Sequence, residues 1–410
     1  MLKDPRVSVC IPSYNHAPYL PAAIESVLRQ SFRDFEIVIV DDGSTDNSLE
    51  IAESYAARNP SQIRVFTHPG RRNLGISATV NLAYQKTLGM YWSGLPSDDL
   101  LRPDQLKRQV ALLDAREDIG WVYSYADCID EEGNPIPRRR MFGQDITRTK
   151  NPLQRLIRNN VIPGMTVMMR RSCTEKVGLH ELGLIYSDWE FWLRMAAQCK
   201  VAFQPHRLVL YRVHSYNTSE HVDPHENARR GLAVMASFKN KLESANYALA
   251  DSRTRSLIEL QLSYHFYCLG EKDQAQQSLH AAFDQDATLA KDTKFFATWL
   301  RDKVFELHHT FVKGSAESRF ALWLQESLDG LGLASLAERA GAAHFAKLAF
   351  EHYDAGLRTS RPMAIKCLGK DSSWFLNPSL RTVLLEGLLG ANVAGRMRRL
   401  KSIYKTDASL

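Results

Sequence analysis

The sequence has no long apolar run, no paired cysteine motif and no strong excess of one charge. No apolar stretch approaches the roughly 18 residues that a membrane-spanning helix needs, so we expect no membrane-spanning helix. The six cysteines are scattered without a CxxC pair, which favours reduced, mostly structural thiols in a cytoplasmic protein. The net charge of +6 is too small over 410 residues to indicate a nucleic-acid partner. The opening segment Met1–Pro5 has no apolar signal region.

The composition is that of a globular protein, since 44% of the residues are hydrophobic and 24% are charged. A chain of 410 residues is long enough for two or three domains with their own cores. The runs Val7–Ile11 and Glu36–Val40 are rich in β-branched residues and predict strands, and the stretch between them has apolar residues at helical spacing. This β-α-β unit predicts a parallel sheet whose strand ends meet at one edge, where small ligands bind.

Strand and helix patterns alternate through residue 125, which is typical of an α/β fold. They predict helices over Asp46–Ala57, Ser77–Thr87 and Pro103–Leu113, and strands over Ile63–Thr67, Met90–Gly94 and Trp121–Tyr125. Residues 130–152 predict a long loop, whose basic run Arg138–Arg140 is either a solvated surface or a contact for a phosphate-bearing substrate. Further patterns predict helices over Leu153–Ile157 and Trp189–Ala197, and strands over Thr166–Met169, Val201–Phe203 and Leu208–Val213.

From about residue 226 the pattern is helical, so we expect one domain over residues 1–225 and an all-α domain over 226–410. The segment Leu262–Ala282 is similar to one tetratricopeptide-type helical hairpin, and Ala346–Asn377 echoes it loosely. Their irregular spacing leaves open whether the domain contains true repeats. The helical domain is expected to dock a partner, to form a homodimer or to cover a substrate cleft, and the sequence does not choose among these roles.

Polar segments follow the first two predicted strands, at Pro12–Asn15 and Asp41–Ser44. Tyr14 is placed to stack on a base, and Asp42 to accept a hydrogen bond from a base or a ribose hydroxyl. Ser44 and the nearby Asp46 are more simply explained as caps of the next helix. Because both strands end at one edge of the sheet, the pattern predicts a nucleotide site there.

Two adjacent carboxylates, Asp98 and Asp99, come shortly after the strand Met90–Gly94. Carboxylate oxygens are the ligands that hard cations prefer, and Mg²⁺ commonly joins a carboxylate to substrate phosphates. The alternative is that one of the pair caps the helix that begins near Pro103. At the same sheet edge as Asp42, the pair favours a metal site beside a nucleotide.

Two further residues, Asp188 and His214, stand at element ends. Asp188 begins the helix that carries Trp189 and Trp192, and it is either a cap stabilised by the helix N-terminus or a general base. His214 follows a strand and is a plausible metal or phosphate ligand, although most lone histidines are neither.

In this order, the motifs resemble the inverting, nucleotide-sugar-dependent glycosyltransferases of family 2, which have the GT-A fold. The resemblance extends from residue 6 to about residue 220 and rests on Val7–Val9, Pro12–Asn15, Asp41–Asp46, Arg72–Gly75, Asn81, Ser97–Asp99, Asp188–Arg194 and Tyr211–His214. It implies an α/β, Rossmann-like mixed and mainly parallel sheet flanked by helices, followed here by the all-α C-terminal domain.

The resemblance also implies roles for single residues. Pro12, Tyr14 and Asp42 match positions that hold the nucleotide base, most often uracil. Asp98 matches a position that contacts ribose or metal. The metal, Mn²⁺ or Mg²⁺, is assigned to Asp99 and His214, and the general base is Asp188. Relatives often have a further aspartate where this sequence has Pro96, so the division of roles between Asp98 and Asp99 stays open.

The implied reaction moves a sugar from a nucleotide sugar, with UDP as the expected nucleotide, to a saccharide or lipid-linked saccharide in bacterial surface polysaccharide synthesis. A cytoplasmic protein with peripheral contact at the inner membrane face is expected. Two alternatives are an inactive nucleotide-sugar-binding protein and a sugar-nucleotide nucleotidyltransferase. The second is disfavoured because the first loop, Pro12–Ala17, has no glycine, lysine or arginine to cradle a triphosphate.

Overall fold

The computed structural model describes residues 4–140, 143–215, 217, 222–244, 251–310, 316–342 and 360–370. Contacts divide the chain into two compact units, one of residues 1–222 with 229–261 and one of residues 223–228 with 262–410. The predicted boundary between residues 225 and 226 remains a prediction. In the part of the chain that the structure describes, no helix combines the length and apolar character needed to cross a membrane.

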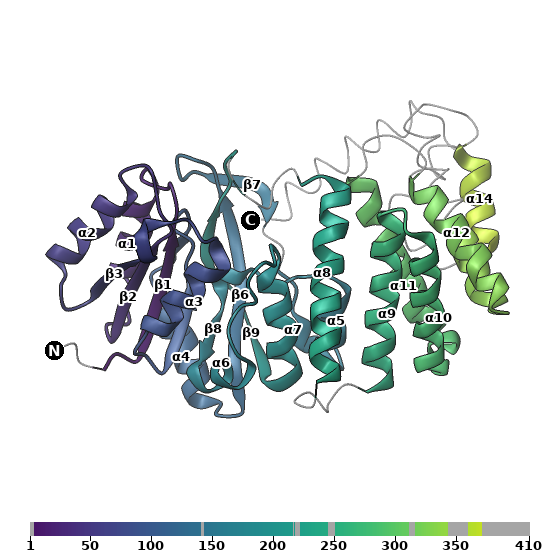
Figure 1. Ribbon diagram of the computed structural model, residues 1–410, viewed down its shortest axis with the longest axis horizontal. Helices are drawn as coiled ribbons and strands as arrows, with labels where there is room; N and C mark the ends of the chain where they lie inside the picture. The colour runs from purple at the N-terminus through teal and green to yellow at the C-terminus, as the bar shows by residue number, and fades with distance from the viewer. Residues whose placement is uncertain are drawn as a thin grey trace, which may run out of the picture. The chain divides into compact units, whose positions relative to one another are not determined.

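The first unit is built on a nine-stranded mixed sheet (Figure 1). The strand order is β3-β2-β1-β4-β8-β6-β9-β5, and β7 pairs with β6. The strands are β1 (Val7–Ser13), β2 (Phe35–Asp41), β3 (Ile63–Thr67), β4 (Tyr91–Gly94), β5 (Leu100–Leu101), β6 (Ile119–Ile129), β7 (Pro135–Arg140), β8 (Met168–Arg170) and β9 (Lys200–Arg212). The predicted α/β class and mixed sheet are confirmed.

Strand direction explains where the polar loops meet. β1 pairs in parallel with β2 and β4, and β6 pairs in parallel with β9. β8 is antiparallel to both β4 and β6, so β9 runs in the same direction as β1. The carboxyl ends of β1, β2, β4 and β9 therefore share one edge of the sheet, although β1 and β9 end 199 residues apart in sequence, at Ser13 and Arg212.

Helices flank the sheet (Figure 1). They are α1 (Leu20–Leu28), α2 (Ser48–Arg58), α3 (Ile76–Lys86), α4 (Gln105–Ala115), α5 (Pro152–Arg158), α6 (Arg171–Val177) and α7 (Ser187–Gln198). β1 and β2 are buried along their whole length, which is why they read as continuous apolar runs rather than as an alternation. Their side chains form one core with those of α1 and α4.

Two predictions about the later strands are wrong. Residues 130–152 are not one long loop, because β7 forms a hairpin with β6 and includes the backbone of Arg138–Arg140. The two strands predicted around residues 201–213 are one strand, β9. Gln204 lies opposite Ser124 and Arg207 opposite Tyr125, so Pro205 and His206 bulge out of the ladder. Pro205 is accommodated within the strand because its missing N–H falls in this bulge.

Two smaller differences concern the segment before α7. The strand predicted from Thr166 begins only at Met168, because Gly164–Thr166 form a 3₁₀ turn. Helix α6 was not predicted, since its sequence, RSCTEKV, has little apolar periodicity.

The C-terminal part of the chain is helical, as predicted. It contains α8 (Pro224–Glu243), α9 (Ser252–Cys268), α10 (Lys272–Gln285), α11 (Thr293–Thr310), α12 (Ala316–Gly330) and α14 (Ser360–Lys370). α9 and α10 are joined by a tight turn in which Gly270 has a φ of 84° and the Glu271 N–H donates to the Phe266 carbonyl at 2.9 Å. The predicted helical hairpin is therefore present. Tetratricopeptide character stays a prediction, and much of its second expected copy, Ala346–Asn377, lies outside the described residues.

Candidate functional site

The loops after β1 and β2 are joined by reciprocal hydrogen bonds. The Asn15 N–H donates to Ser44 Oγ at 3.0 Å, and the Thr45 N–H donates to Asn15 Oδ1 at 2.7 Å. Asp46 bridges the same loops, since its carboxylate accepts from the N–H of Ala17 at 3.0 Å and of Ser48 at 2.9 Å. Tyr14, in the first of these loops, is 44% exposed and is therefore available to stack on a planar ligand.

Asp42 is buried and holds a third loop against this edge. Its two carboxylate oxygens accept from the N–H groups of Leu74 at 2.8 Å and Gly75 at 3.0 Å. Gly43 next to it has a φ of 75°, and a Cβ there would lie 2.6 Å from the Arg71 carbonyl oxygen, so a side chain would displace this loop. The predicted contact of Asp42 with a base therefore stays a prediction, and the structure adds an anchoring role. Pro12, the remaining predicted base contact, is buried within β1.

Asp98 and His214 meet directly, with Asp98 Oδ2 3.0 Å from His214 Nε2. His16, from the loop after β1, completes a group of three whose ligand atoms all lie within 4.8 Å of one another. Burial lowers the pKa of His16, which keeps its imidazole neutral and able to bind a metal. Two imidazoles and one carboxylate form a donor set that fits a divalent cation.

Asp99 is not a member of that group. It is fully buried, and its Oδ1 accepts from the Arg212 N–H at 2.8 Å, while its Oδ2 has no hydrogen-bond partner among the described residues. Burial, together with the neighbouring Asp98 carboxylate, raises the pKa of Asp99 well above its usual range. The structure therefore groups the predicted ligand His214 with Asp98, and places Asp99 against the end of β9.

Short strand β5 explains why this cluster forms. β5 follows Asp99 at once and pairs with β9, opposing Leu100 to Leu210, which brings the aspartate pair beside the segment that leads to His214. Tyr19 stacks on the His214 ring with 5.1 Å between the ring centroids. The Arg212 guanidinium lies over the Tyr19 ring, 5.0 Å from its centre. These contacts orient the histidine.

Asp188 lies in the first turn of α7 and is partly exposed. Its Oδ2 accepts from Asn160 Nδ2 at 2.9 Å. Burial raises the pKa of Asp188, and the Asn160 amide and the Trp189 backbone N–H partly oppose that rise. A partly exposed carboxylate that has a raised pKa and is oriented by a hydrogen-bond donor has the properties of a general base.

The other carboxylate of this turn, Glu190, has a structural role. It is fully buried and its Oε1 lies 2.8 Å from Arg194 Nε and 2.9 Å from Lys241 Nζ. Trp189 Nε1 donates to the Leu156 carbonyl at 2.8 Å, and Trp192 stacks on Trp121 with 5.6 Å between centroids. Trp189 and Trp192 thus lie on a buried face of α7, and among the described residues Asp188 has no ion pair.

Helix α3 connects Asp188 to the loop that Asp42 holds. Ser77, two residues after Gly75, hydrogen-bonds Ser187 at 2.8 Å between the two hydroxyls. Asn81, one turn later, binds the backbone of His180 through both its amide oxygen and its amide nitrogen. The segment before Asp188 is therefore fastened to the same helix that begins at the Asp42 loop.

Two residues of the site were missed by sequence reasoning. His16 directly follows the Pro12–Asn15 segment, so its position at a strand end was an available signal. Asn160 lies in an irregular stretch after α5, and no local pattern separates it from other loop asparagines. Its contact with Asp188 depends on tertiary packing.

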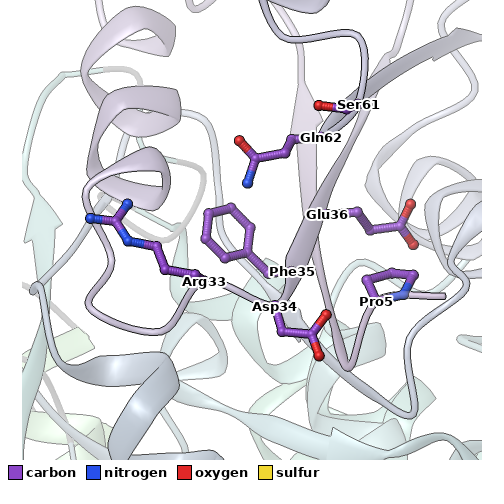
Figure 2. A pocket seen from close by; sticks show the side chains of 7 residues that line it. All are labelled: Pro5, Arg33, Asp34, Phe35, Glu36, Ser61 and Gln62. Atoms are coloured by element: carbon purple, nitrogen blue, oxygen red, sulfur yellow. The ribbon is translucent and has the colours of Figure 1, made fainter. Parts of the chain in front are cut away.

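A hollow of about 380 Å³ lies at the other edge of the sheet (Figure 2). Figure 2 shows Pro5, Glu36 and Gln62 among its lining residues, and these come from the segments at which β1, β2 and β3 begin. It is therefore separate from the loops at the strand ends.

Part of the chain is similar in sequence to known proteins. The model of glycosyl transferase family 2 matches residues 8–178. An uncharacterized glycosyltransferase of Haemophilus influenzae is 30% identical over 196 residues, which cover 48% of this chain and 74% of that protein. An uncharacterized glycosyltransferase of Rickettsia typhi is 30% identical over 224 residues, covering 53% of this chain and 66% of that protein.

Two further similarities extend the comparison. Escherichia coli chondroitin synthase is 38% identical over 134 residues, which are 32% of this chain and 19% of the synthase. The crystal structure of S. aureus TarS 1-349 in complex with UDP-GlcNAc is similar with a TM-score of 0.52 at 16% identity, covering 86% of this chain and 92% of that one. At this identity the structural likeness shows the fold alone.

Proposed function

Because this chain belongs to glycosyltransferase family 2, we propose that it transfers a sugar from a nucleoside-diphosphate sugar to an acceptor hydroxyl, with inversion at the anomeric carbon. The observation that carries this proposal is the convergence of His16, Asp98 and His214 at the strand edge that also carries Tyr14. A base-stacking side chain beside a cation-binding group suits a nucleotide diphosphate.

His16, Asp98 and His214 would hold the divalent cation. When bound, such an ion offsets the negative charge that develops on the leaving nucleoside diphosphate. Tyr14 and the loop held by Asp42 would bind and orient the base. UDP is proposed as the nucleotide, and the UDP-GlcNAc complex of the similarly folded TarS supports this choice.

Asp188 is proposed to accept the proton of the acceptor hydroxyl at a carboxylate oxygen as that hydroxyl attacks the anomeric carbon. Asn160 fixes the orientation of the carboxylate through its 2.9 Å hydrogen bond. Direct displacement inverts the attacked centre, and no covalent intermediate with the protein is needed.

The protonation of Asp188 predicts the effect of Asn160→Ala. The base works when deprotonated, so a raised pKa places the acid limb of kcat/KM above the usual aspartate range. Removing the Asn160 donor is expected to raise that pKa further and shift the acid limb to higher pH. A pH profile of kcat/KM checks this, with Asn134→Ala in the turn before β7 as control. An acid limb that stays in place or moves to lower pH would contradict the role of Asn160.

The acceptor is proposed to be a saccharide in surface polysaccharide synthesis, and the E. coli relative named chondroitin synthase supports a saccharide. Leu182 and Ile185, in the segment just before Asp188, are 64% and 55% exposed. Exposed aliphatic side chains in the segment that leads to the proposed general base favour an acceptor that carries an apolar group, as a lipid-linked saccharide does.

This proposal predicts the behaviour of Leu182→Ser and Ile185→Ser. Each variant is expected to raise the KM for a lipid-linked acceptor several-fold while donor hydrolysis is unchanged, because apolar contact is lost only with the acceptor. Leu88→Ser is the matched control, since Leu88 is also exposed but lies before β4, at the other edge of the sheet. Equal KM values for all three variants would refute the apolar contact.

The direct test of the proposed function is a screen of nucleotide sugars against the full chain, measuring donor hydrolysis and thermal stabilisation with and without Mn²⁺. We expect one UDP-sugar to be hydrolysed and to raise the Tm in a metal-dependent way. Stabilisation without hydrolysis or transfer would instead favour the inactive nucleotide-sugar-binding alternative. The scattered cysteines, without a CxxC pair, support the proposed cytoplasmic location. Peripheral membrane contact and a homodimer remain predictions.

A further inference from the structure

Two cysteine thiols lie close together away from the strand edge that carries the site. Cys173 belongs to α6, and Cys199 directly follows the last residue of α7. Of the six cysteines, these two are the ones that are only half-buried, whereas Cys10, Cys128, Cys268 and Cys367 are buried. A reagent in solution can therefore reach this pair more readily than the other thiols.

Gly120 in β6 marks where the two cysteines converge. A Cβ built on Gly120 would lie 2.4 Å from Cys173 Sγ, 2.8 Å from Cys199 Cβ and 3.5 Å from Cys199 Sγ. Both cysteine side chains thus occupy the space that any larger residue at position 120 would need. The segments are held together independently, because Lys176 Nζ donates to the Gln198 carbonyl at 3.3 Å.

The two thiols are not equivalent. A hydrogen bond from the Cys199 thiol lowers the pKa of Cys173 and raises the pKa of Cys199. The thiolate is the attacking form in disulfide exchange, so Cys173 is suited to react first and Cys199 to react second.

We propose that Cys173 and Cys199 form a reversible intramolecular disulfide by exchange with a small-molecule disulfide such as oxidised glutathione. The Cys173 thiolate attacks one sulfur of that disulfide, forms a mixed disulfide and releases one thiolate. Cys199 then loses its proton and attacks Cys173 Sγ, which expels the second thiolate. The two cysteines are oxidised, and the small disulfide is reduced to two thiols. Disulfides of this kind in cytoplasmic proteins are usually transient and redox-sensing.

The cross-link would enclose the chain from Cys173 to Cys199, which includes the exposed segment around Leu182 and the base candidate Asp188. Closing this loop lowers the conformational entropy of the unfolded chain, so the oxidised protein is expected to melt several degrees higher than the reduced one. The inference stands on the thiol geometry and does not depend on the proposed sugar transfer.

The test is to incubate the reduced full-length protein in glutathione buffers of increasing oxidation, alkylate the free thiols and map the peptides by mass spectrometry. We expect a mass loss of two hydrogens, a single Cys173–Cys199 link and a raised Tm, all reversed by dithiothreitol. Cys199→Ser should accumulate a glutathione adduct at Cys173, and Cys173→Ser should form neither the link nor that adduct.

Gly120→Ala provides a matched geometric control, because its added methyl group would displace the sulfur atoms and should lower the yield of the link in a folded variant. The proposal is overturned if the natively folded protein gives no Cys173–Cys199 link, stable mixed disulfides at both residues, or a link to any other cysteine or another chain.

Discussion

Asp188→Asn is expected to lower the rate of sugar transfer by about 10²–10⁴-fold, because the amide cannot accept the proton of the acceptor hydroxyl. The substitution is nearly isosteric, and the Asn160 donor that contacts Asp188 at 2.9 Å can still meet an amide oxygen. Donor affinity is therefore expected to stay within a few fold of the original. Single-turnover transfer and titration with a nucleotide sugar measure the two quantities separately.

Glu175→Gln is the control for this variant, since Glu175 is an exposed carboxylate on α6 outside the site. It should retain full activity. Near-normal turnover by Asp188→Asn would show that another group accepts the proton. The neighbouring Glu190 is a poor candidate because it is buried against Arg194 and Lys241.

Asp98→Asn is expected to weaken Mn²⁺ binding by more than about tenfold, since even the loss of an outer contact at a metal site costs 10–100-fold. The variant removes the anionic member of the His16–Asp98–His214 group. Binding of a nucleotide sugar should accordingly lose most of its dependence on the metal. Electron paramagnetic resonance of Mn²⁺ measures the metal affinity directly, without a need for turnover.

Asp99→Asn distinguishes the two aspartates. An asparagine can still accept from the Arg212 N–H, and it mimics the protonated carboxyl that burial and Asp98 favour at this position. We expect its Mn²⁺ affinity to change by no more than a few fold. A loss equal to that of Asp98→Asn would instead support the sequence-based assignment of Asp99 as a metal ligand. Asp127→Asn, which alters a surface ion pair with Arg102, is the matched control.

Much of the secondary structure of the first unit was predictable because the hydrophobic pattern and the turn residues indicate the same strand bounds. β1 and β2 are buried on both faces and therefore appear as unbroken β-branched runs, and each is followed by polar residues at a point where the chain must turn. β9 was harder, because Pro205 resembles a strand end in sequence. Only the ladder with β6 shows that the bulge absorbs it.

The sequence alone determined that Asp42, Asp98, Asp188 and His214 stand at element ends in an α/β chain, because hydrophobic periodicity and turn chemistry are local properties. Tertiary structure decided which of them meet. The pairing of β5 with β9 joins Asp98 to His214, separated by 116 residues, and brings Asp99 to the Arg212 backbone. The loop after β1 adds His16 to this group. Such partnerships depend on strand order and direction, which no single segment of the chain encodes.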